Sequence, residues 1–196
     1  AQNYLKNGNK LTVVRILDGS FTGAKAAVGA KSGSVSFQLN TIAHGNTMNN
    51  SSPKSTNSVL TSGSQDNVRW EISSVNESKG TFTLLIRRGN DRQTQKVALE
   101  TWNDLSLDPN SNNYITRKIG DQYAEFAGTA ADPYVNYNGN YPQKSKYVYV
   151  SEVLNTPNYL DENSEVSDVT LTAKLPLPGS GSVDGAFASG SVGYSG

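Results

Sequence analysis

The stretch TFTLLIRRGNDRQTQKVALETWNDLSLDPNSNNYITRKIG, from Thr81 to Gly120, decides the fold of this chain. Its first part alternates with period two, which predicts a strand whose buried face is made by Phe82, Leu84 and Ile86. The tripeptide Gly-Asn-Asp at positions 89–91 then has the chemistry of a turn. A second alternating segment follows, so we expect an antiparallel hairpin with one buried face.

The second strand of this hairpin is predicted by Val97 and Leu99, which alternate with polar neighbours and should face the core. A short helix should follow and lie against the hairpin. Asp108 is a good N-cap, Pro109 suits the first helical position, and Gly120 would end the helix. The residues expected to form its apolar stripe and its basic last turn are Tyr114, Ile115, Ile119, Arg117 and Lys118.

The composition indicates a β-rich protein without a strong electrostatic field. Of the 196 residues, 35% are hydrophobic and 18 are glycine, so turns and strands should outweigh helices. Lys plus Arg and Asp plus Glu both number 17, and this neutrality argues against nucleic acid as a partner. The absence of cysteine excludes disulfides, thiolate nucleophiles and thiolate metal ligands.

The ends and the hydropathy of the chain suggest neither a signal peptide nor a membrane segment. The sequence begins at Ala1 without a charged and then apolar leader, so we expect a processed or excised chain. No run approaches the roughly 20 apolar residues that span a bilayer, so we expect no membrane insertion.

The first third of the chain predicts two strands, one short helix and a long loop. Residues 11–17 have apolar side chains on both faces, as in a fully buried strand, whereas the alanines of 21–31 suggest a short helix. Residues 34–42 predict a strand with one wet face, in which the apolar positions are Val35, Phe37 and Leu39. Residues 45–63 should form a long exposed loop.

The central strands complete a meander. Val68, Trp70 and Ile72 alternate in a strand that a turn at 76–80 joins to the hairpin described first. Strand signals closed by one helix predict an α+β, β-rich fold. We expect a small β-barrel or sandwich with a flanking helix, together with part of a second β-sandwich layer.

The last third of the chain mixes connections with strands. Residues 122–143 are rich in Asn, Gly, Tyr and Pro and should be connection rather than regular structure. Residues 146–153 predict a strand, 155–168 a solvated acidic loop, and 169–175 a final alternating strand. Gly, Ser and Pro without periodicity then predict a linker.

The stretch from Phe82 to Asp121 also resembles contractile tail sheath proteins of bacteriophages and related injection machines. The strand and loop VALETWNDLSLDPNSNNY and the helix ITRKIGD carry this resemblance, and its most specific part is LDPNSNNY, from Leu107 to Tyr114. LTVVRILDG at 11–19 is similar to the family's strand that enters its outer domains. LNTIAHGNTMNN at 39–50 is similar to a family loop but lacks its usual tryptophan and second glycine.

The resemblance implies a domain order. Residues 1–33 would be part of the sheath middle domain, and 34–126 would form the outer, protruding β-rich domain. Residues 127–178 would be the return strands of the middle domain. Residues 179–196 would be a Gly/Ser-rich linker toward a further domain, which Ser182-Val183-Asp184-Gly185 would open.

The same resemblance implies a structural, non-enzymatic function in the virion, with the chain made in the host cytoplasm. Copies of the intact subunit would stack in six-fold rings around an inner tail tube above a baseplate. Contraction would drive the tube through the target cell envelope. No catalytic, cofactor-binding or metal-binding residue is required, and no cofactor is expected. Because the lattice-forming parts of such subunits lie near the termini of the intact protein, this chain alone should be monomeric.

Several residues are candidates for chemistry, each with a plainer interpretation. His44, the single histidine, is more readily a surface or loop residue than part of a triad or metal site. Asp161, Glu162, Glu165 and Asp168 suggest weak calcium binding but lack EF-hand spacing, and a solvated acidic run is favoured. A third candidate is a glycine pattern that superficially resembles a phosphate-binding loop, but no lysine and no helix pattern follow it, so a flexible linker is favoured. Its glycines are Gly179, Gly181 and Gly185.

Aromatic and charged clusters suggest two kinds of surface. Trp70, Trp102 and the tyrosines between Tyr134 and Tyr149 suggest a sugar-stacking surface, although strand aromatics more often pack in a core. A β-rich glycan-binding or adhesion module is therefore the alternative function. An enzyme ranks third, because no carboxylate pair stands out. The expected hairpin tip also carries a cluster of charges, which could contact a neighbouring subunit or could simply be solvated. Its members are Arg87, Arg88, Asp91 and Arg92.

Overall fold

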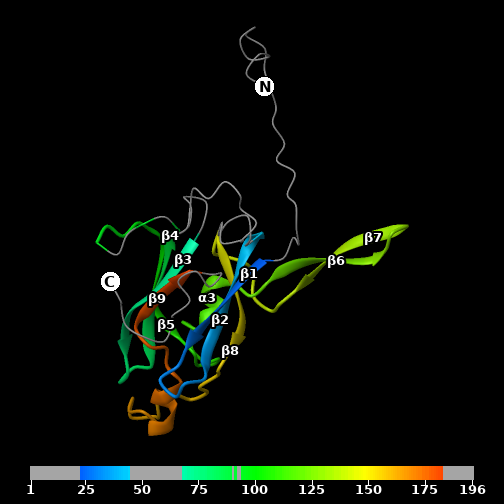
Figure 1. Cartoon of the computed structure of the whole chain (residues 1–196). Helices are drawn as coiled ribbons and strands as arrows, with labels where there is room; N and C mark the ends of the chain where they lie inside the picture. The colour runs from blue at the N-terminus through cyan, green and yellow to red at the C-terminus, as the bar shows by residue number, and fades with distance from the viewer. Residues whose placement is uncertain (1–22, 45–67, 90, 92–93, 183–196) are drawn as a thin grey trace.

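The computed structural model describes residues 23–44, 68–89, 91 and 94–182 (Figure 1). The strand expected at 11–17 and the exposed loop expected at 45–63 lie outside these residues. Within them the chain is β-rich, with antiparallel sheets, one short α-helix, one short 3-10 helix and no closed barrel. The sandwich-like form of the prediction is therefore confirmed.

One sheet contains the predicted meander. Its strands are β3 (Val68–Asn76), β4 (Thr81–Arg88), β5 (Ala98–Ser106) and β9 (Gly179–Ser182), in the order β5-β4-β3-β9. All neighbours are antiparallel, and Trp70 of β3 lies opposite Ile86 of β4. The alternation predicted for β4 is confirmed, since Phe82, Leu84 and Ile86 are at most 2% exposed while Leu85 between them is only partly buried. Val97, however, is 40% exposed and lies just before β5 rather than in the buried face.

The other main sheet has the order β1-β2-β8, with β1 at Gly23–Gly29, β2 at Val35–His44 and β8 at Val148–Val153. The strands predicted at 34–42 and 146–153 are confirmed. The wet face predicted for 34–42 is wrong, because Ser36 and Asn40 are buried and Val35 is 43% exposed. β2 is the central strand of its sheet, paired along its two edges with β1 and β8, and it is buried on both faces around Ser36 and Asn40.

The short helix expected within 21–31 is also wrong, because 23–29 form strand β1. Ala26 and Val28 point into the core, while Lys25 and Ala27 are exposed, which is the period of a strand. Pairing with β2 therefore outweighs the helix propensity of alanine in a segment bounded by two glycines.

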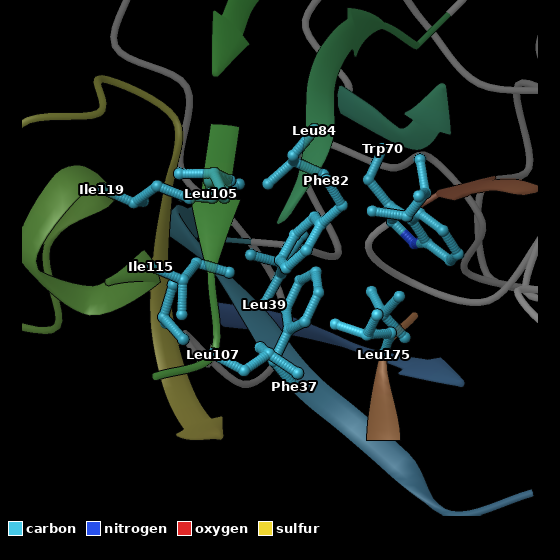
Figure 2. Close-up of a cluster of buried hydrophobic side chains, with 14 of the residues drawn as sticks. Phe37, Leu39, Trp70, Phe82, Leu84, Leu105, Leu107, Ile115, Ile119 and Leu175 are labelled. Atoms are coloured by element: carbon cyan, nitrogen blue, oxygen red, sulfur yellow. The ribbon is translucent and has the colours of Figure 1, made fainter. Parts of the chain in front are cut away.

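The core lies between the two sheets (Figure 2). The rings of Phe37 from β2 and Phe82 from β4 stack across it, with centroids 5.5 Å apart and planes 14° from parallel. Ile115 and Ile119 of the helix α3 (Ile115–Ile119) enter the same core beside Leu105 and Leu107. Both isoleucines are fully buried, and the helix contacts β5 of one sheet and β8 of the other, so it packs against both sheets.

The helix starts later than its sequence signals predict. It begins at Ile115, and its N-cap is Tyr114 rather than Asp108. The preceding turns are held by Ser106, whose amide donates to the Asn113 carbonyl (2.9 Å) while Ser106 forms a parallel bridge with Tyr114. The predicted end is confirmed, because Gly120 closes the helix with φ 109°.

Asp108 organises a turn instead of capping the helix. Its Oδ1 accepts the Asn110 amide (2.8 Å), and its Oδ2 accepts the amide of Tyr159 (3.2 Å), far along the chain. The side chain of Tyr159 is buried, and its hydroxyl donates to the Glu77 carbonyl. The segment most specific to the sheath resemblance thus joins the meander to the chain near residue 159.

Three predictions for the last third need correction. Residues 122–143, expected to be connection, contain a two-stranded sheet of β6 (Tyr123–Thr129) and β7 (Asp132–Asn138). The strand expected at 169–175 is the 3-10 helix η1 (Val169–Lys174), because Asp168 caps it by accepting the Thr170 amide. The linker expected from 179 begins with β9, which pairs with β3.

The described residues share one core. The buried cluster includes Val28 and Leu175 from the segments expected to belong to the middle domain, and Leu39 and Ile115 from the segment expected to be the outer domain. The expected boundary at 126/127 falls inside β6.

Candidate interaction surface

The hairpin of β6 and β7 has one wholly apolar face. In its regular antiparallel register, Phe126 lies opposite Val135, with Ala124 opposite Tyr137 on one side and Gly128 opposite Pro133 on the other. Directly opposed residues share a face, and so do residues two positions apart along a strand. The apolar face is therefore made by Ala124, Phe126, Gly128, Pro133, Val135 and Tyr137.

This apolar face is exposed. Phe126 is 86% exposed, more than any other large hydrophobic residue in the described part of the chain, and Tyr137 and Val135 are 71% and 46% exposed. The smaller members of the face are exposed as well. Singly exposed apolar residues are ordinary on protein surfaces, whereas these six form one contiguous patch, which makes the face a candidate for interaction.

The opposite side of the hairpin, its polar face, carries hydrogen-bonding groups. Asn138 donates to the Glu125 carboxylate (3.0 Å), and Asn136 donates to the side-chain oxygen of Asn138 (3.1 Å). The charged residues of the hairpin, Glu125 and Asp132, both lie on this face. The hairpin is thus amphipathic, with its charged residues confined to the polar face and none on the apolar face.

The polar face also anchors the hairpin to the body. The Tyr123 ring stacks on that of Tyr149 in β8, with centroids 5.4 Å apart. Burial raises the pKa of the Tyr149 hydroxyl above its ordinary value, and the nearby Tyr123 adds to this shift. Figure 1 shows the rest of the hairpin projecting from the body beyond this contact.

The neck of the hairpin is closely packed. The Tyr141 amide donates to the Asp121 carboxylate (2.7 Å), which ties the two chain segments together. Gly139 has φ 109°, and a Cβ there would lie 2.5 Å from the Asp121 carbonyl oxygen. Only glycine fits such a position without displacing backbone. The hairpin therefore leaves the body through a defined crossing.

A shallow apolar hollow of about 210 Å³ lies at the far end of β8 from this anchor. It is formed where the start of β2 meets the end of β8, and Val35 on its rim is 43% exposed. Its lining residues are Val35, Ser36, Phe37, Glu152, Val153 and Leu154. Pockets for drug-sized ligands measure about 300–1,000 Å³, so this hollow suits a side chain rather than a small molecule.

The charge cluster predicted near Arg87 is neither a solvated tip nor an exposed contact. Arg87 and Asp91 are buried and form two parallel hydrogen bonds, Nε to Oδ2 (2.7 Å) and Nη2 to Oδ1 (2.9 Å). Arg87 also donates to the Glu71 carboxylate (2.7 Å) in β3. Both interpretations of the cluster are therefore wrong for this pair, and Arg92 lies outside the described residues.

Two further cations complete this buried network. Lys96 binds the second oxygen of Glu71 (2.7 Å), and Arg69 lies 3.5 Å from Asp91. Burial alone would lower the pKa of Arg87, but hydrogen bonds and charges from Asp91 and Glu71 raise it above its ordinary value. The pKa of Arg69 is lowered, mainly by burial. The network is a structural element that fixes the β4–β5 corner.

The remaining sequence candidates are dispersed. His44 is the last residue of β2, paired with Gly23. Asp161 accepts the Asn163 and Glu165 amides (both 2.9 Å), so it shapes its own exposed turn. Across the described ranges, no three His, Cys, Asp or Glu residues are grouped as metal ligands would be. Gly179 and Gly181 pair in β9 rather than forming a phosphate-binding loop, and Gly185 lies outside the described residues.

The predicted aromatic surface is only partly real. Trp70 is 1% exposed and belongs to the core, so its proposed role in sugar stacking is wrong. Trp102 is partly buried and donates to Glu100 (3.1 Å). Tyr134 and Tyr137 are exposed, but on opposite faces of the hairpin. Sequence reasoning missed Phe126, although its period-two spacing from Ala124 and Gly128 was a usable signal.

Comparison of the chain with protein-family models, with curated proteins and with solved structures finds no match. Among the described residues, no helix has the length and apolar character needed to cross a membrane.

Proposed function

We propose that this chain is part of a structural, non-enzymatic subunit of a contractile tail sheath, and that its hairpin contacts neighbouring subunits. The resemblance of Leu107–Tyr114 to sheath proteins supplies the family. The exposed apolar face of β6 and β7 is the observation that carries the structural role, because such a face gains free energy by contact with another protein surface.

The size of the apolar face favours a contact that is weak by itself. A two-stranded face of this length covers roughly 230 Å², which at about 25 cal/mol per Å² gives roughly 6 kcal/mol before costs. Association costs about 4–15 kcal/mol, and stable interfaces bury about 800 Å² per partner. The isolated chain should therefore be monomeric, and the contact should matter where subunits are already held side by side.

This setting is the one that a sheath provides. Intact subunits would form six-fold rings around an inner tail tube and above a baseplate, in a virion assembled in the host cytoplasm. Contraction would rearrange the rings and drive the tube through the target envelope. Contacts worth little individually can change partners during such a rearrangement, and their differences add over many copies.

The test is to extend the coding sequence on both sides of this chain, express the longer protein and examine it by electron microscopy. We expect a reading frame that continues into a lattice-forming core, and rings or tubes built from the longer protein. A stop codon directly after Gly196, or a longer protein that stays monomeric at high concentration, would contradict the proposal.

A glycan-binding or adhesion module is the second candidate, and the polar face favours it. There Tyr134 is exposed on the same face as Asn136 and Glu125, the combination of aromatic ring and hydrogen-bonding groups that sugars need. Glycan-array binding that is lost in Tyr134→Ala and kept in Phe126→Ser would support this function. Trp70 cannot serve in this test, because its replacement would remove core packing.

A further inference from the structure

We propose that the apolar face of the β6–β7 hairpin docks into the apolar hollow of a second copy of this chain. This inference rests on the proposed function for the repeated array in which copies meet, and it deepens that function by naming both surfaces. The hairpin supplies Phe126 at its centre, and the hollow supplies Val35 and Val153.

The two surfaces match in chemistry. The apolar face carries no charged residue, and the hollow is lined mainly by apolar side chains. Glu152 is the charged residue of that lining, and the hairpin's own carboxylates lie on its polar face. Docking therefore brings no like charges together, and it removes the most exposed large apolar side chain of the described residues from water.

The two surfaces also match in size. The hollow of about 210 Å³ has room for a single aromatic side chain. Phe126 projects from a hairpin that stands clear of the body, so its ring can enter a recess on another molecule (Figure 1). Aromatic residues that fill a recess are the usual centres of protein interfaces.

The placement of the surfaces makes the contact repeat. The hairpin is anchored at Tyr149, near the start of β8, whereas the hollow is lined by Val153, at the end of that strand. The hairpin projects away from the end of β8 that carries the hollow (Figure 1). Since the two surfaces differ, each copy can give its hairpin to one neighbour and receive another's. Such heterologous contacts build rings or open arrays rather than closed pairs.

Disulfide trapping in the complete 196-residue chain tests this arrangement, because the chain has no cysteine of its own. A chain carrying both Phe126→Cys and Val35→Cys is oxidised at high protein concentration and separated on a non-reducing gel. Both positions are exposed, so the fold should tolerate them. We expect a ladder of dimers, trimers and larger species, which a reducing agent removes.

Matched controls locate the contact. A chain with Glu125→Cys and Val35→Cys places the thiol on the polar face and should lose the ladder. Each single-cysteine chain should give at most a faint dimer. A strong dimer from Phe126→Cys alone would show hairpin-to-hairpin pairing and would overturn the proposal, as would equal ladders from both double variants or no ladder at all.

The disulfide-trapping result can be told apart from the test of the proposed function, which is the assembly of the longer protein. If the longer protein forms sheath-like tubes but the double-cysteine chain gives no ladder, the function stands and this contact is wrong. If the ladder forms but the longer protein does not assemble, the contact stands as self-association of another kind.

Discussion

Replacing Arg87 by alanine tests the buried network at the β4–β5 corner. The guanidinium makes three hydrogen bonds of 2.7–2.9 Å to the carboxylates of Asp91 and Glu71, and all three side chains are at most 2% exposed. Removing one partner of a buried ion pair costs about 3–5 kcal/mol, because a charge stays behind in a poorly solvated place.

The structure places the expected loss in the lower half of that range. Without Arg87, Glu71 still binds Lys96 (2.7 Å), and Asp91 still accepts the Val97 amide (3.0 Å) beside Arg69. We therefore expect the free energy of unfolding to fall by about 3–4 kcal/mol. Arg87→Lys keeps the charge but loses the two parallel bonds, and should cost about 1.5–3 kcal/mol.

Urea unfolding followed by tryptophan fluorescence measures both losses, since Trp70 is buried next to Glu71 in β3. Lys25→Ala, at an exposed position in β1, is the control and should change stability by less than about 0.5 kcal/mol. If Arg87→Ala leaves too little folded protein, the lysine variant still reports the network.

Salt and pH sharpen this test. High salt should leave the loss largely unchanged, because buried pairs are weakly screened. The folded-state pKa of Arg87 is raised, so its contribution is complete below the ordinary arginine pKa and disappears only at higher pH. If Arg87→Ala lowers the free energy of unfolding by less than about 1 kcal/mol, this reasoning is refuted, because removing one partner of a buried pair should cost about 3–4 kcal/mol. A loss abolished by high salt would refute it as well.

Three further predictions concern stability. Gly80→Ala should cost more than Gly33→Ala in thermal unfolding, because both have positive φ but only at Gly80 would a Cβ overlap the ring of Tyr159; equal losses would contradict this. Asp108→Ala should lower the free energy of unfolding by about 1–3 kcal/mol through two lost hydrogen bonds, and an unchanged urea midpoint would argue against that role. Hydrogen bonds from the Thr170 amide and hydroxyl lower the pKa of Asp168. The stabilisation of η1 by the Asp168 carboxylate should therefore be complete above the ordinary aspartate pKa and be lost as the pH falls through the lowered pKa. An NMR titration that gives Asp168 an ordinary midpoint would exclude this role.

The meander was predictable because its signal is local. Phe82, Leu84 and Ile86 alternate in sequence and are buried together, and a turn at 77–80 joins β3 to β4 as expected. The end of α3 at Gly120 was equally local. Its start was not, because the pairing of Ser106 with Tyr114 keeps 108–113 out of the helix, and no helix-start rule contains that contact.

The hairpin was missed for a different reason. Its strands are joined by Ala130-Ala131, which has none of the Asn or Gly that marks most two-residue hairpin turns. The Asn138-Gly139 signal stands at the hairpin's neck instead. The charge cluster was predictable in part, since Arg87 and Asp91 are only four residues apart in the sequence. Their burial depends on Glu71, which lies in another strand.

Strand β9 gives the described fold a mechanical weak point. It consists of Gly179-Ser180-Gly181-Ser182 and is held on β3 mainly by main-chain pairing, since its glycines bring no side chain to the core. Tension passed along the chain from beyond Ser182 meets these few hydrogen bonds first, so β9 should peel away while the packed sheets stay whole. Loss of β9 would leave the edge of β3 from Arg69 to Ile72 unpaired, and an unpaired sheet edge is a template to which another strand can add.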